Sequence, residues 1–251
     1  MSKIIPIKTL EELAILREAG RILSGVLKQV AASVRPGMTT WDIDELTESL
    51  IRKQGCVPAF KGYRGFPGSA CVSVNQEVVH GIPSPQRKIS DGDIVSIDVG
   101  LIYEKYYADS ALTVGVGSVN PEVQQLMDVT REALNKGIAQ ALVGSHLSDI
   151  SHAIQTYAEA HGCAVVRDFV GHGIGKNLHE EPEVLNYGPP NCGPILQEGM
   201  VLCLEPMLNM GDWKTNILDD GWTVETADGK PSAHFEHMVA IQTNGPEILT
   251  A

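Results

Sequence analysis

Four carboxylates and one imidazole stand in short apolar runs or glycine-rich turns, where an unpaired charge is out of place. They are Asp98, Asp109, His172, Glu205 and Glu236. Burying a lone carboxylate is costly unless it is paired or binds a metal, and four that converge would repel one another without cations between them. The set therefore predicts two divalent metal ions that share bridging carboxylates, and hydrolytic chemistry at that centre.

The first two carboxylates are expected on neighbouring strands of one hairpin. The segment 94–100, IVSIDVG, alternates as a strand does. A hairpin centred on Tyr103-Glu104 would place Asp98 directly opposite Asp109, with both side chains on one face. Because Tyr103-Glu104 is not a favoured two-residue turn, the conformation of the loop stays open. For Asp109, which precedes a serine, a role as a turn or cap residue is the alternative interpretation.

The other three ligands lie in the second half of the chain. Glycines flank His172 in GHGIGKNLHE (171–180) and allow backbone and ligand to approach closely. Glu205 closes the apolar run VLCLEP, and Glu236 opens FEHMVAI, so neither placement suits a solvated charge. A buried arginine partner is the rival interpretation of these acids, but few arginines lie nearby in the sequence.

The donor types narrow the choice of metal and of chemistry. An oxygen-rich set disfavours structural zinc, which prefers Cys and His, whereas carboxylates with imidazole suit Mn(II), Fe(II) or Co(II), with Zn(II) also compatible. Two such ions about 3.5–4 Å apart would lower the pKa of a bridging water and polarise a carbonyl. A remaining histidine would then contact the substrate, and the candidates are His80, in VVHGIP, and His179.

The composition is that of an acidic protein without a targeting segment. Of the 251 residues, 19 are Lys or Arg and 31 are Asp or Glu, which gives a net charge of −12 and argues against a nucleic-acid partner. The five cysteines form no CxxC pair, as is typical of reduced thiols. No apolar run approaches the ~18 residues of a membrane span, and the start is not a signal peptide. We expect a cytoplasmic protein with no membrane partner.

Helices and strands are expected in two rounds along the chain. Thr9 with Glu12 forms a capping-box pattern that starts a helix ending before Pro36-Gly37, and a second helix is expected over about 40–54. Strand-like runs follow to about 116. Two more helices are expected over about 120–143 and 148–161, and strands with glycine-rich loops fill the remainder.

This order indicates an internal duplication with an offset of 107 residues. The offset maps residues without a gap: Gly37, Asp42, Ile43, Gly55 and Gly92 fall on Gly144, Asp149, Ile150, Gly162 and Gly199. It also maps DGDIVSID (91–98) onto EGMVLCLE (198–205) and so places Asp98 on Glu205. We therefore expect equivalent halves, about 9–116 and 120–245, with the functional site between them.

The motifs, taken together and in order, resemble those of the type I methionine aminopeptidases. They are VVHGIP, DGDIVSIDVG with the spacing of Asp98 and Asp109, GHGIG with His179, LEPML and FEH. The resemblance runs from about residue 10 to the end of the chain. It implies the mixed α/β (α+β) pita-bread fold of creatinases and aminopeptidases, with pseudo-twofold symmetric halves around a central antiparallel sheet. It also implies one catalytic domain over residues 1–251, without a separate N-terminal domain.

The resemblance assigns roles to the candidate residues. It implies that Asp109 and Glu236 bridge the two metals and that Glu205 shuttles a proton from the nucleophilic water to the leaving amine. His80 would lie near the scissile amide nitrogen, and His179 would hydrogen-bond the carbonyl oxygen as it gains charge. The free α-amine of the substrate would bind a metal ion, which explains exopeptidase activity.

The resemblance also implies a methionine pocket and a site for a sodium or potassium ion. The pocket residues would be Tyr63, Phe66, Cys71, Leu178 and Trp222. Aromatic walls and a thiol suit a thioether side chain, although without the resemblance core packing is the simpler interpretation. The monovalent cation would be bound by Asn75, Ser232 and a carbonyl near Glu77. Three positions depart from the family pattern: His234 where Gln is usual, Met238 in place of Thr, and Phe169 near the substrate entrance.

The leading hypothesis is a monomeric, short bacterial-type enzyme that removes the initiator methionine from nascent chains whose second residue is small. A proline-specific relative, such as aminopeptidase P or prolidase, is the first alternative. Those enzymes usually carry an additional N-terminal domain, and only about 35 residues precede Pro36-Gly37. The second alternative is an inactive pita-bread protein that binds partners, which would typically lack metal ligands. All five ligand residues are present in this chain.

Overall fold

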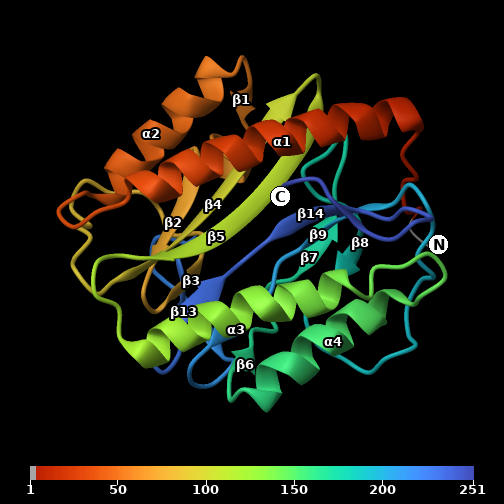
Figure 1. Ribbon diagram of the computed structural model, residues 1–251. Helices are drawn as coiled ribbons and strands as arrows, with labels where there is room; N and C mark the ends of the chain where they lie inside the picture. The colour runs from red at the N-terminus through yellow and green to blue at the C-terminus, as the bar shows by residue number, and fades with distance from the viewer. Residues whose placement is uncertain (1–3) are drawn as a thin grey trace.

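The computed structural model describes residues 4–251 of the chain. Its four long helices form two pairs that cover one side of a layer of antiparallel strands (Figure 1). Helices α1 and α2 lie over the strands of the first half, and α3 and α4 over those of the second. The fold is thus a mixed α/β arrangement of two similar halves.

The first half begins with the two helices and continues into strands. Its elements are α1 (Leu10–Ser33), α2 (Thr40–Lys53), β1 (Val57–Pro58), the short 3-10 helix η1 (Tyr63–Gly65), β2 (Ala70–Val74), β3 (Glu77–Val79), β4 (Ile94–Tyr103) and β5 (Tyr106–Gly115). The predicted capping box at Thr9 and Glu12 is confirmed, because each side chain accepts a hydrogen bond from the backbone N–H of the other. An equivalent box at Thr39 and Asp42 starts α2.

The second half repeats this order with shorter strands. Its elements are α3 (Pro121–Ile138), α4 (Leu147–Ala160), β6 (Ala164–Val165), β7 (Gly171–Gly173), β8 (Glu180–Val184), β9 (Val201–Leu204), β10 (Met207–Asn209), β11 (Thr215–Ile217), β12 (Val224–Thr226), β13 (Ser232–His234), β14 (His237–Ala240) and β15 (Glu247–Ile248). Helix α3 ends five residues before the predicted end at 143. Leu142 and Val143 instead lie exposed in the turn that leads to Gly144.

The backbone confirms the predicted offset of 107 residues. Helix α2 (40–53), moved by 107, coincides with α4 (147–160). Gly37 and Gly144 share φ values of 90° and 92°, and Gly92 and Gly199 share 89° and 88°. The only isolated β-bridges of residues 4–251, Thr39–Lys88 and His146–Ile195, are related by the same offset. The two halves therefore repeat each other in conformation as well as in sequence.

The strands form four antiparallel sheets in which the halves use equivalent positions. In the first half β4 pairs with both β2 and β5, and in the second half β9 pairs with both β7 and β14. The halves are joined where the N–H of Glu236 donates to the carbonyl of Ala111 (2.8 Å) and the hydroxyl of Ser110 donates to the carbonyl of Glu236 (2.8 Å). Strand β5 therefore lies against the segment that carries Glu236.

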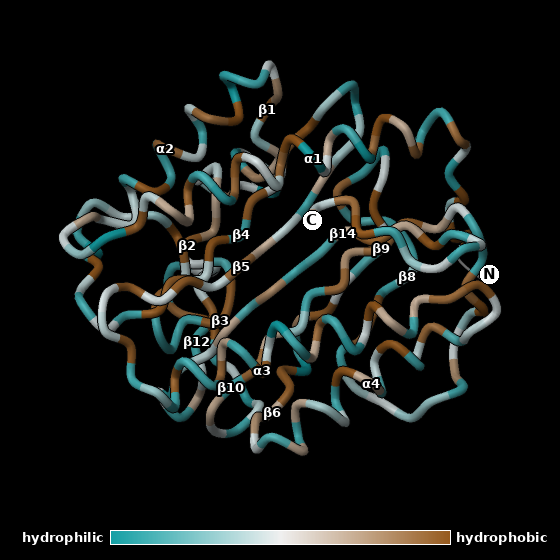
Figure 2. Tube along the Cα trace, in the orientation of Figure 1, coloured by the Kyte–Doolittle hydropathy of each residue, from teal (hydrophilic) through white to brown (hydrophobic). Residues whose placement is uncertain are grey.

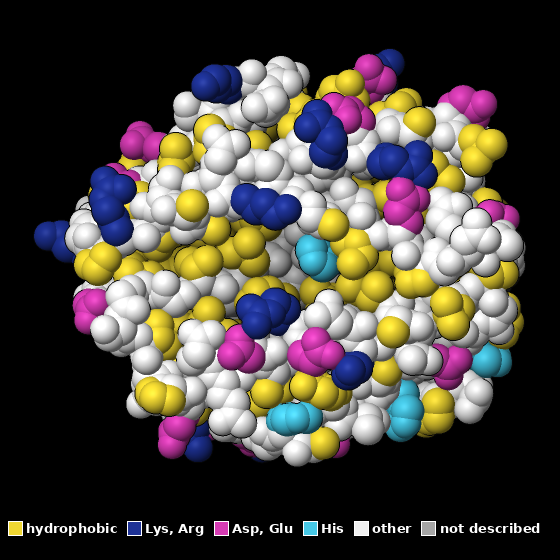
Figure 3. Space-filling model, in the orientation of Figure 1, with side chains coloured by type: hydrophobic (Ala, Val, Ile, Leu, Met, Phe, Trp, Pro, Cys, Tyr) yellow, Lys and Arg dark blue, Asp and Glu magenta, His cyan; other side chains and the backbone are white. Residues whose placement is uncertain are grey.

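Each half has its own hydrophobic core beneath its helices. The larger cluster is formed mainly by apolar side chains of α1, α2, β2, β4 and β5, and the second mainly by those of α3, α4, β9 and β14. A small third cluster contains Val78 and Val79 of β3. Figure 2 shows apolar and polar residues alternating along the helices and strands, as expected of elements with one buried face. On the helix side, Figure 3 shows a hollow between α1 and α3, lined by residues that include Lys28, Arg131 and His237.

Candidate metal centre and active site

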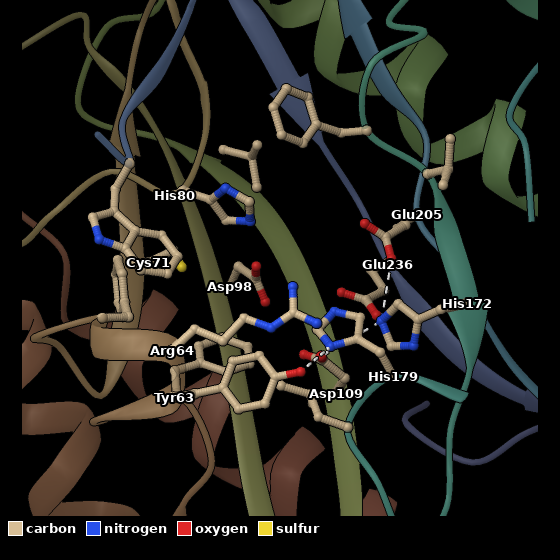
Figure 4. Close-up of a pocket in the computed structure, with 17 residues that line it drawn as sticks. Tyr63, Arg64, Cys71, His80, Asp98, Asp109, His172, His179, Glu205 and Glu236 are labelled. Atoms are coloured by element: carbon tan, nitrogen blue, oxygen red, sulfur yellow. Dashed lines mark hydrogen bonds and ion pairs between the residues drawn. The ribbon is translucent and has the colours of Figure 1, made fainter. Parts of the chain in front are cut away.

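A cavity of about 200 Å³ brings the predicted site residues together. All five predicted metal ligands, both auxiliary histidines and all five predicted pocket residues line it. Those lining residues are Asp98, Asp109, His172, Glu205 and Glu236, then His80 and His179, then Tyr63, Phe66, Cys71, Leu178 and Trp222. They come from strands and loops of both halves (Figure 4), as the duplication predicted.

Asp98 and Asp109 lie on β4 and β5, but the predicted register is wrong by two residues. Asp98 pairs with Ala111, and Asp109 pairs with Gly100. The turn falls at Glu104-Lys105, where both residues have positive φ (45° and 68°), the conformation of a tight hairpin turn whose twist suits the strands. Because a shift of two positions keeps side chains on the same face, the two carboxylates still face one cavity as diagonal neighbours.

The second half contributes the imidazole and the two glutamates. His172 lies on β7, Glu205 follows β9, and Glu236 lies between β13 and β14. The Nε2 atom of His172 is 3.5 Å from Oε1 of Glu205 and 4.0 Å from Oδ2 of Asp109. Its Nδ1 atom is 2.9 Å from the carbonyl of Gly173. A proton on Nδ1 satisfies that carbonyl and leaves Nε2 free to accept a cation.

Burial keeps the carboxylates of this cluster from holding their charge alone. It raises the pKa of Asp98 to about 7. Burial, with repulsion from neighbouring carboxylates, also raises the pKa of Asp109, Glu205 and Glu236 well above the ordinary range. Oxygen atoms of Asp98, Asp109 and Glu236 are buried without a hydrogen-bond partner. A cation bound among these oxygens would supply the partners that they lack.

Two groups of donors are compact enough to hold an ion each. One oxygen from each of Asp98, Asp109 and Glu236 lie within 4.8 Å of one another, and so do one donor each from His172, Cys203 and Glu236. Glu236 belongs to both groups, which suits a carboxylate shared between two ions. The donor set fits divalent metals that accept carboxylate and imidazole. Cys203 was not predicted, because a single cysteine in an apolar strand carries no ligand pattern.

The two auxiliary histidines line the same cavity, and burial favours the neutral form of each. Burial lowers the pKa of His80 to about 4 and also lowers the pKa of His179. His80 has a φ of 60°, and its ring packs edge-on against those of Phe169 and Trp222, with centroids 5.5 and 6.1 Å away. The Nδ1 atom of His179 lies 2.9 Å from the hydroxyl of Tyr63. Neutral imidazoles can donate one hydrogen bond to a substrate.

An apolar recess adjoins the carboxylate cluster. The rings of Phe66 and Trp222 meet edge to face at 5.2 Å, and Leu178 is buried beside them. Cys71 lies directly opposite Asp98 on the paired strands β2 and β4, and burial raises the pKa of its thiol well above the usual range. The thiol is therefore neutral and forms an apolar wall next to the carboxylate cluster.

The remaining predicted residues lie outside the cavity, with one exception. Asn75 and Ser232 are neighbours, since the N–H of Ser232 donates to the carbonyl of Asn75 (2.9 Å), but the side-chain amide of Asn75 already bonds Asp93 and Ile94. His234 is buried, with both ring nitrogens lacking a partner, and Met238 is buried in the core of the first half. Phe169 does line the cavity.

One charged residue of the cavity was missed from the sequence. Arg64 lines it beside Tyr63, in η1, with left-handed backbone angles (φ 49°, ψ 21°). An arginine in a short loop carries no periodicity or ligand pattern that marks it, so only the folded chain shows where its guanidinium lies (Figure 4).

Comparison with known proteins finds one metallopeptidase family and relatives that share one name. Residues 14–243 match the metallopeptidase family M24. The chain is 52% identical over 246 residues to the "Methionine aminopeptidase" of Clostridium perfringens, covering 98% of each chain. It is 51% identical over 243 residues to "Methionine aminopeptidase 1" of Bacillus subtilis, covering 97% of this chain and 98% of that one.

Solved structures give the same result at the level of the fold. The methionine aminopeptidase structure from Rickettsia prowazekii superposes with a TM-score of 0.97 at 40% identity, covering 99% of this chain and 100% of that one. The prolidase from Pyrococcus horikoshii gives a TM-score of 0.78 at 24% identity, and its match covers 98% of this chain but 63% of that one. The prolidase likeness therefore shows a shared pita-bread fold alone.

Proposed function

The chain belongs to the metallopeptidase family M24, and from this premise we propose that it is a methionine aminopeptidase, a hydrolase that removes the N-terminal methionine from peptides and nascent chains. The observation that carries the proposal is the cavity in which four buried carboxylates and one imidazole adjoin an apolar recess. The relatives that match over the whole chain bear the same name. A proline-specific activity has support only from likeness of fold.

The metal ligands would be the five residues of the cluster, with Asp109 and Glu236 shared between two divalent ions. The unpartnered oxygens of Asp98, Asp109 and Glu236 support a cation among these residues, and the two donor groups that share Glu236 support that residue as a shared ligand. Such ions, when bound, lower the pKa of a water molecule, polarise a carbonyl and neutralise the carboxylates around them. Co, Mn, Fe and Zn are all compatible with the donors.

Glu205 is placed to move a proton during hydrolysis. Its carboxylate lies at the edge of the cluster, and burial raises its pKa well above that of an exposed glutamate, which favours a group that accepts and returns a proton. In the proposed mechanism Glu205 takes the proton from the attacking water and delivers it to the nitrogen of the leaving amine. The carbon–nitrogen bond breaks as that nitrogen gains its proton.

The two neutral histidines would act on the peptide bond itself. His179, oriented by the Tyr63 hydroxyl, would donate a hydrogen bond to the carbonyl oxygen as that oxygen gains negative charge. His80, fixed between Phe169 and Trp222, would lie near the scissile nitrogen and stabilise the tetrahedral intermediate. Neither role needs a protonated imidazole, in agreement with their lowered pKa values.

The recess accounts for the choice of methionine. Phe66 and Trp222 offer aromatic faces, and the neutral thiol of Cys71 closes one wall. A thioether side chain makes favourable contacts with such rings, and Tyr63 and Leu178 would complete the pocket. The free α-amine would lie at the carboxylate cluster, so that only the first residue of a chain is released. We also propose that the second residue must be small, and that Asn75 and Ser232 bind a sodium or potassium ion.

The partners we propose are peptides and nascent chains that begin with methionine, bound by a monomer of this chain. Within residues 4–251, no helix combines the length and the apolar character needed to cross a membrane.

Methionine release from a Met-Ala-Ser peptide tests the proposal. Protein stripped with a chelator is resupplied with Mn(II), Fe(II) or Co(II), and a Gly-Pro peptide is assayed beside it. Metal-dependent release of methionine without cleavage of Gly-Pro is the expected result. Cleavage of Gly-Pro alone would move the chain to the proline-specific relatives, and silence on both substrates with no metal retained would point to a binding protein.

A further inference from the structure

Arg64 is the one lysine or arginine among the described residues that line the active-site cavity. Its residue is exposed to solvent, yet its guanidinium reaches into the cavity beside Tyr63 and His179 (Figure 4). A free cation therefore lies beside the group that we expect to meet the scissile carbonyl.

The backbone fixes this position. Arg64 is left-handed (φ 49°, ψ 21°), a conformation that is unfavourable for residues other than glycine and is held only where the surroundings enforce it. Four backbone hydrogen bonds close the turn around it, in which the N–H groups of Gly62, Tyr63, Gly65 and Phe66 donate to the carbonyls of Phe66 (2.8 Å), Phe60 (2.9 Å), Gly62 (3.2 Å) and Tyr63 (2.9 Å) respectively. The turn that carries two walls of the methionine pocket thus also carries Arg64.

Among residues 4–251, the Arg64 side chain has a favourable aromatic neighbour but forms no ion pair. Its guanidinium carbon lies 5.4 Å from the centre of the Tyr63 ring, as in a weak cation–π contact. No ion pair joins it to the other residues drawn in Figure 4. Once divalent ions neutralise the carboxylates deeper in the cavity, Arg64 leaves a net positive charge beside the path along which the substrate chain leaves.

The path of the substrate indicates which residue Arg64 meets. The Tyr63–His179 hydrogen bond of 2.9 Å places Arg64 next to the proposed contact of the first residue's carbonyl. An extended peptide advances about 3.3 Å per residue, so the side chains just beyond the small second residue pass within reach of a long arginine side chain.

We propose that Arg64 is a specificity-determining residue that binds a carboxylate side chain at the third position of the substrate. This inference rests on the proposed function. Guanidinium pairs with carboxylate through two parallel hydrogen bonds, so aspartate or glutamate at this position is favoured. Lysine or arginine there is repelled. A carboxylate-rich site in a chain of net charge −12 tends to repel acidic substrates. The positive charge of Arg64 offsets that repulsion.

Three peptides that differ in one residue test the proposal on the metal-loaded enzyme. They are Met-Ala-Asp-Gly, Met-Ala-Asn-Gly and Met-Ala-Lys-Gly, each with an amidated C-terminus so that no second carboxylate competes. For the wild type, kcat/KM for the Asp peptide exceeds that for the Lys peptide by about fivefold to tenfold, as when one exposed charge pair changes from attraction to repulsion. Added salt shrinks the ratio.

Variants of Arg64 separate its charge from its place in the fold. Arg64→Asn keeps a residue that tolerates left-handed angles and brings the Asp-to-Lys ratio to about one, whereas Arg64→Lys retains most of it. Arg35→Asn is the matched control, because Arg35 is exposed, its guanidinium donates to the carbonyl of Ser33 (3.3 Å), and it does not line the cavity. It removes the same charge and leaves the ratio at the wild-type value.

The outcomes distinguish this inference from the proposed function. Methionine release with an equal rate for all three peptides in the wild type, or an unchanged ratio in Arg64→Asn, overturns the role of Arg64 alone. A ratio that does not respond to salt also overturns it, even if no variant folds. Absence of methionine release from all three peptides overturns the proposed function, and the role of Arg64 with it.

Discussion

A buried ion pair ties the N-terminal segment to the loop that carries His179. The Nζ atom of Lys8 lies 2.5 Å from Oε2 of Glu180, and their side chains are only 5% and 7% exposed. The other oxygen of Glu180 accepts the N–H of Asn177 (3.0 Å), while the N–H of Lys8 donates to the carbonyl of Gly199 (2.8 Å). Replacement of Lys8 by methionine would fill the space but leave Glu180 charged and buried.

The size of the effect follows from that burial. Removing one partner of a buried pair costs about 3–5 kcal/mol, because the other charge loses its compensation. For a chain of this length each kcal/mol lowers Tm by about 2–4 °C, so Lys8→Met should lower Tm by roughly 10 °C. Glu180→Gln added to Lys8→Met removes the stranded charge and should recover most of the loss, to within about 1 kcal/mol of the wild type.

Urea unfolding of the four proteins of this double-mutant cycle, at one fixed metal concentration, measures the coupling. Arg17→Met is the control, because its pair with Glu247 is exposed (side chains 49% and 34%), and loss of such a pair costs under about 1 kcal/mol. Lys8→Met should also lower kcat, because the loop that positions His179 loses the ion pair between Glu180 and Lys8. A loss of stability for Lys8→Met no larger than for Arg17→Met would refute the reasoning.

Three further predictions concern the site itself. Glu205→Gln should lower kcat by about 10²–10⁴-fold without loss of the circular dichroism of the fold; a variant with near-native kcat would remove Glu205 from proton transfer. His179→Ala should lower kcat by about 10²–10³-fold and change KM much less, and an effect confined to KM would contradict its role at the carbonyl. Burial raises the pKa of Asp98 to about 7 and that of Glu205 and Glu236 well above normal. A proton thus stabilises the folded, metal-free protein. The contribution of this protonation to the free energy of unfolding is fully present below about pH 4 and is lost as the pH rises through 7. The Tm of the protein in chelator should therefore fall between about pH 5 and pH 8. Metal-loaded protein should show the opposite trend, because protons compete with the ions; parallel trends with and without metal would show that the carboxylates are not the ligands.

The position of the site could be predicted because its residues violate the normal pattern of their surroundings. Asp98 interrupts an apolar strand and Glu205 ends one, and both lie in the cavity. The register of the hairpin could not be predicted, because Glu104 and Lys105 are not residues that favour positive φ, yet both adopt it. The alternation of the strand fixed the face of each aspartate, and an error of two residues leaves that face unchanged.

Two features that depend only on the folded arrangement, the position of Arg64 and the buried ion pair of Lys8, could not be predicted from the sequence. Arg64 lies in a loop whose left-handed angle is imposed by the turn between Phe60 and Phe66. The buried ion pair joins Lys8 and Glu180, which lie 172 positions apart in the sequence. No sequence pattern around either residue predicts that they pair. Such contacts depend on how the N-terminal segment crosses the second half, which no local periodicity encodes.

The duplication explains where the site lies better than it explains which residues form it. The offset of 107 relates Asp98 to Glu205, and both line the cavity. The pairing of the strands extends this relation. In the first half Asp98 pairs with Ala111. In the second half Leu204 pairs with His237, so the same register continued by one residue sets Glu205 opposite Glu236. The first half thus has an alanine at the position where the second has Glu236, the proposed shared ligand.

The asymmetry has a physical reason. Two carboxylates related by the pseudo-twofold axis are enough to start an acidic site, but an ion centre also needs a neutral donor and a free proton carrier. His172 would be the first, and the raised pKa of Glu205 suits the second. A fully symmetric site would have given each half the same charge, the same pKa and no means of moving a proton in one direction. Symmetry therefore places the cavity between the halves, and divergence of single residues within equivalent strands gives the cavity its chemistry.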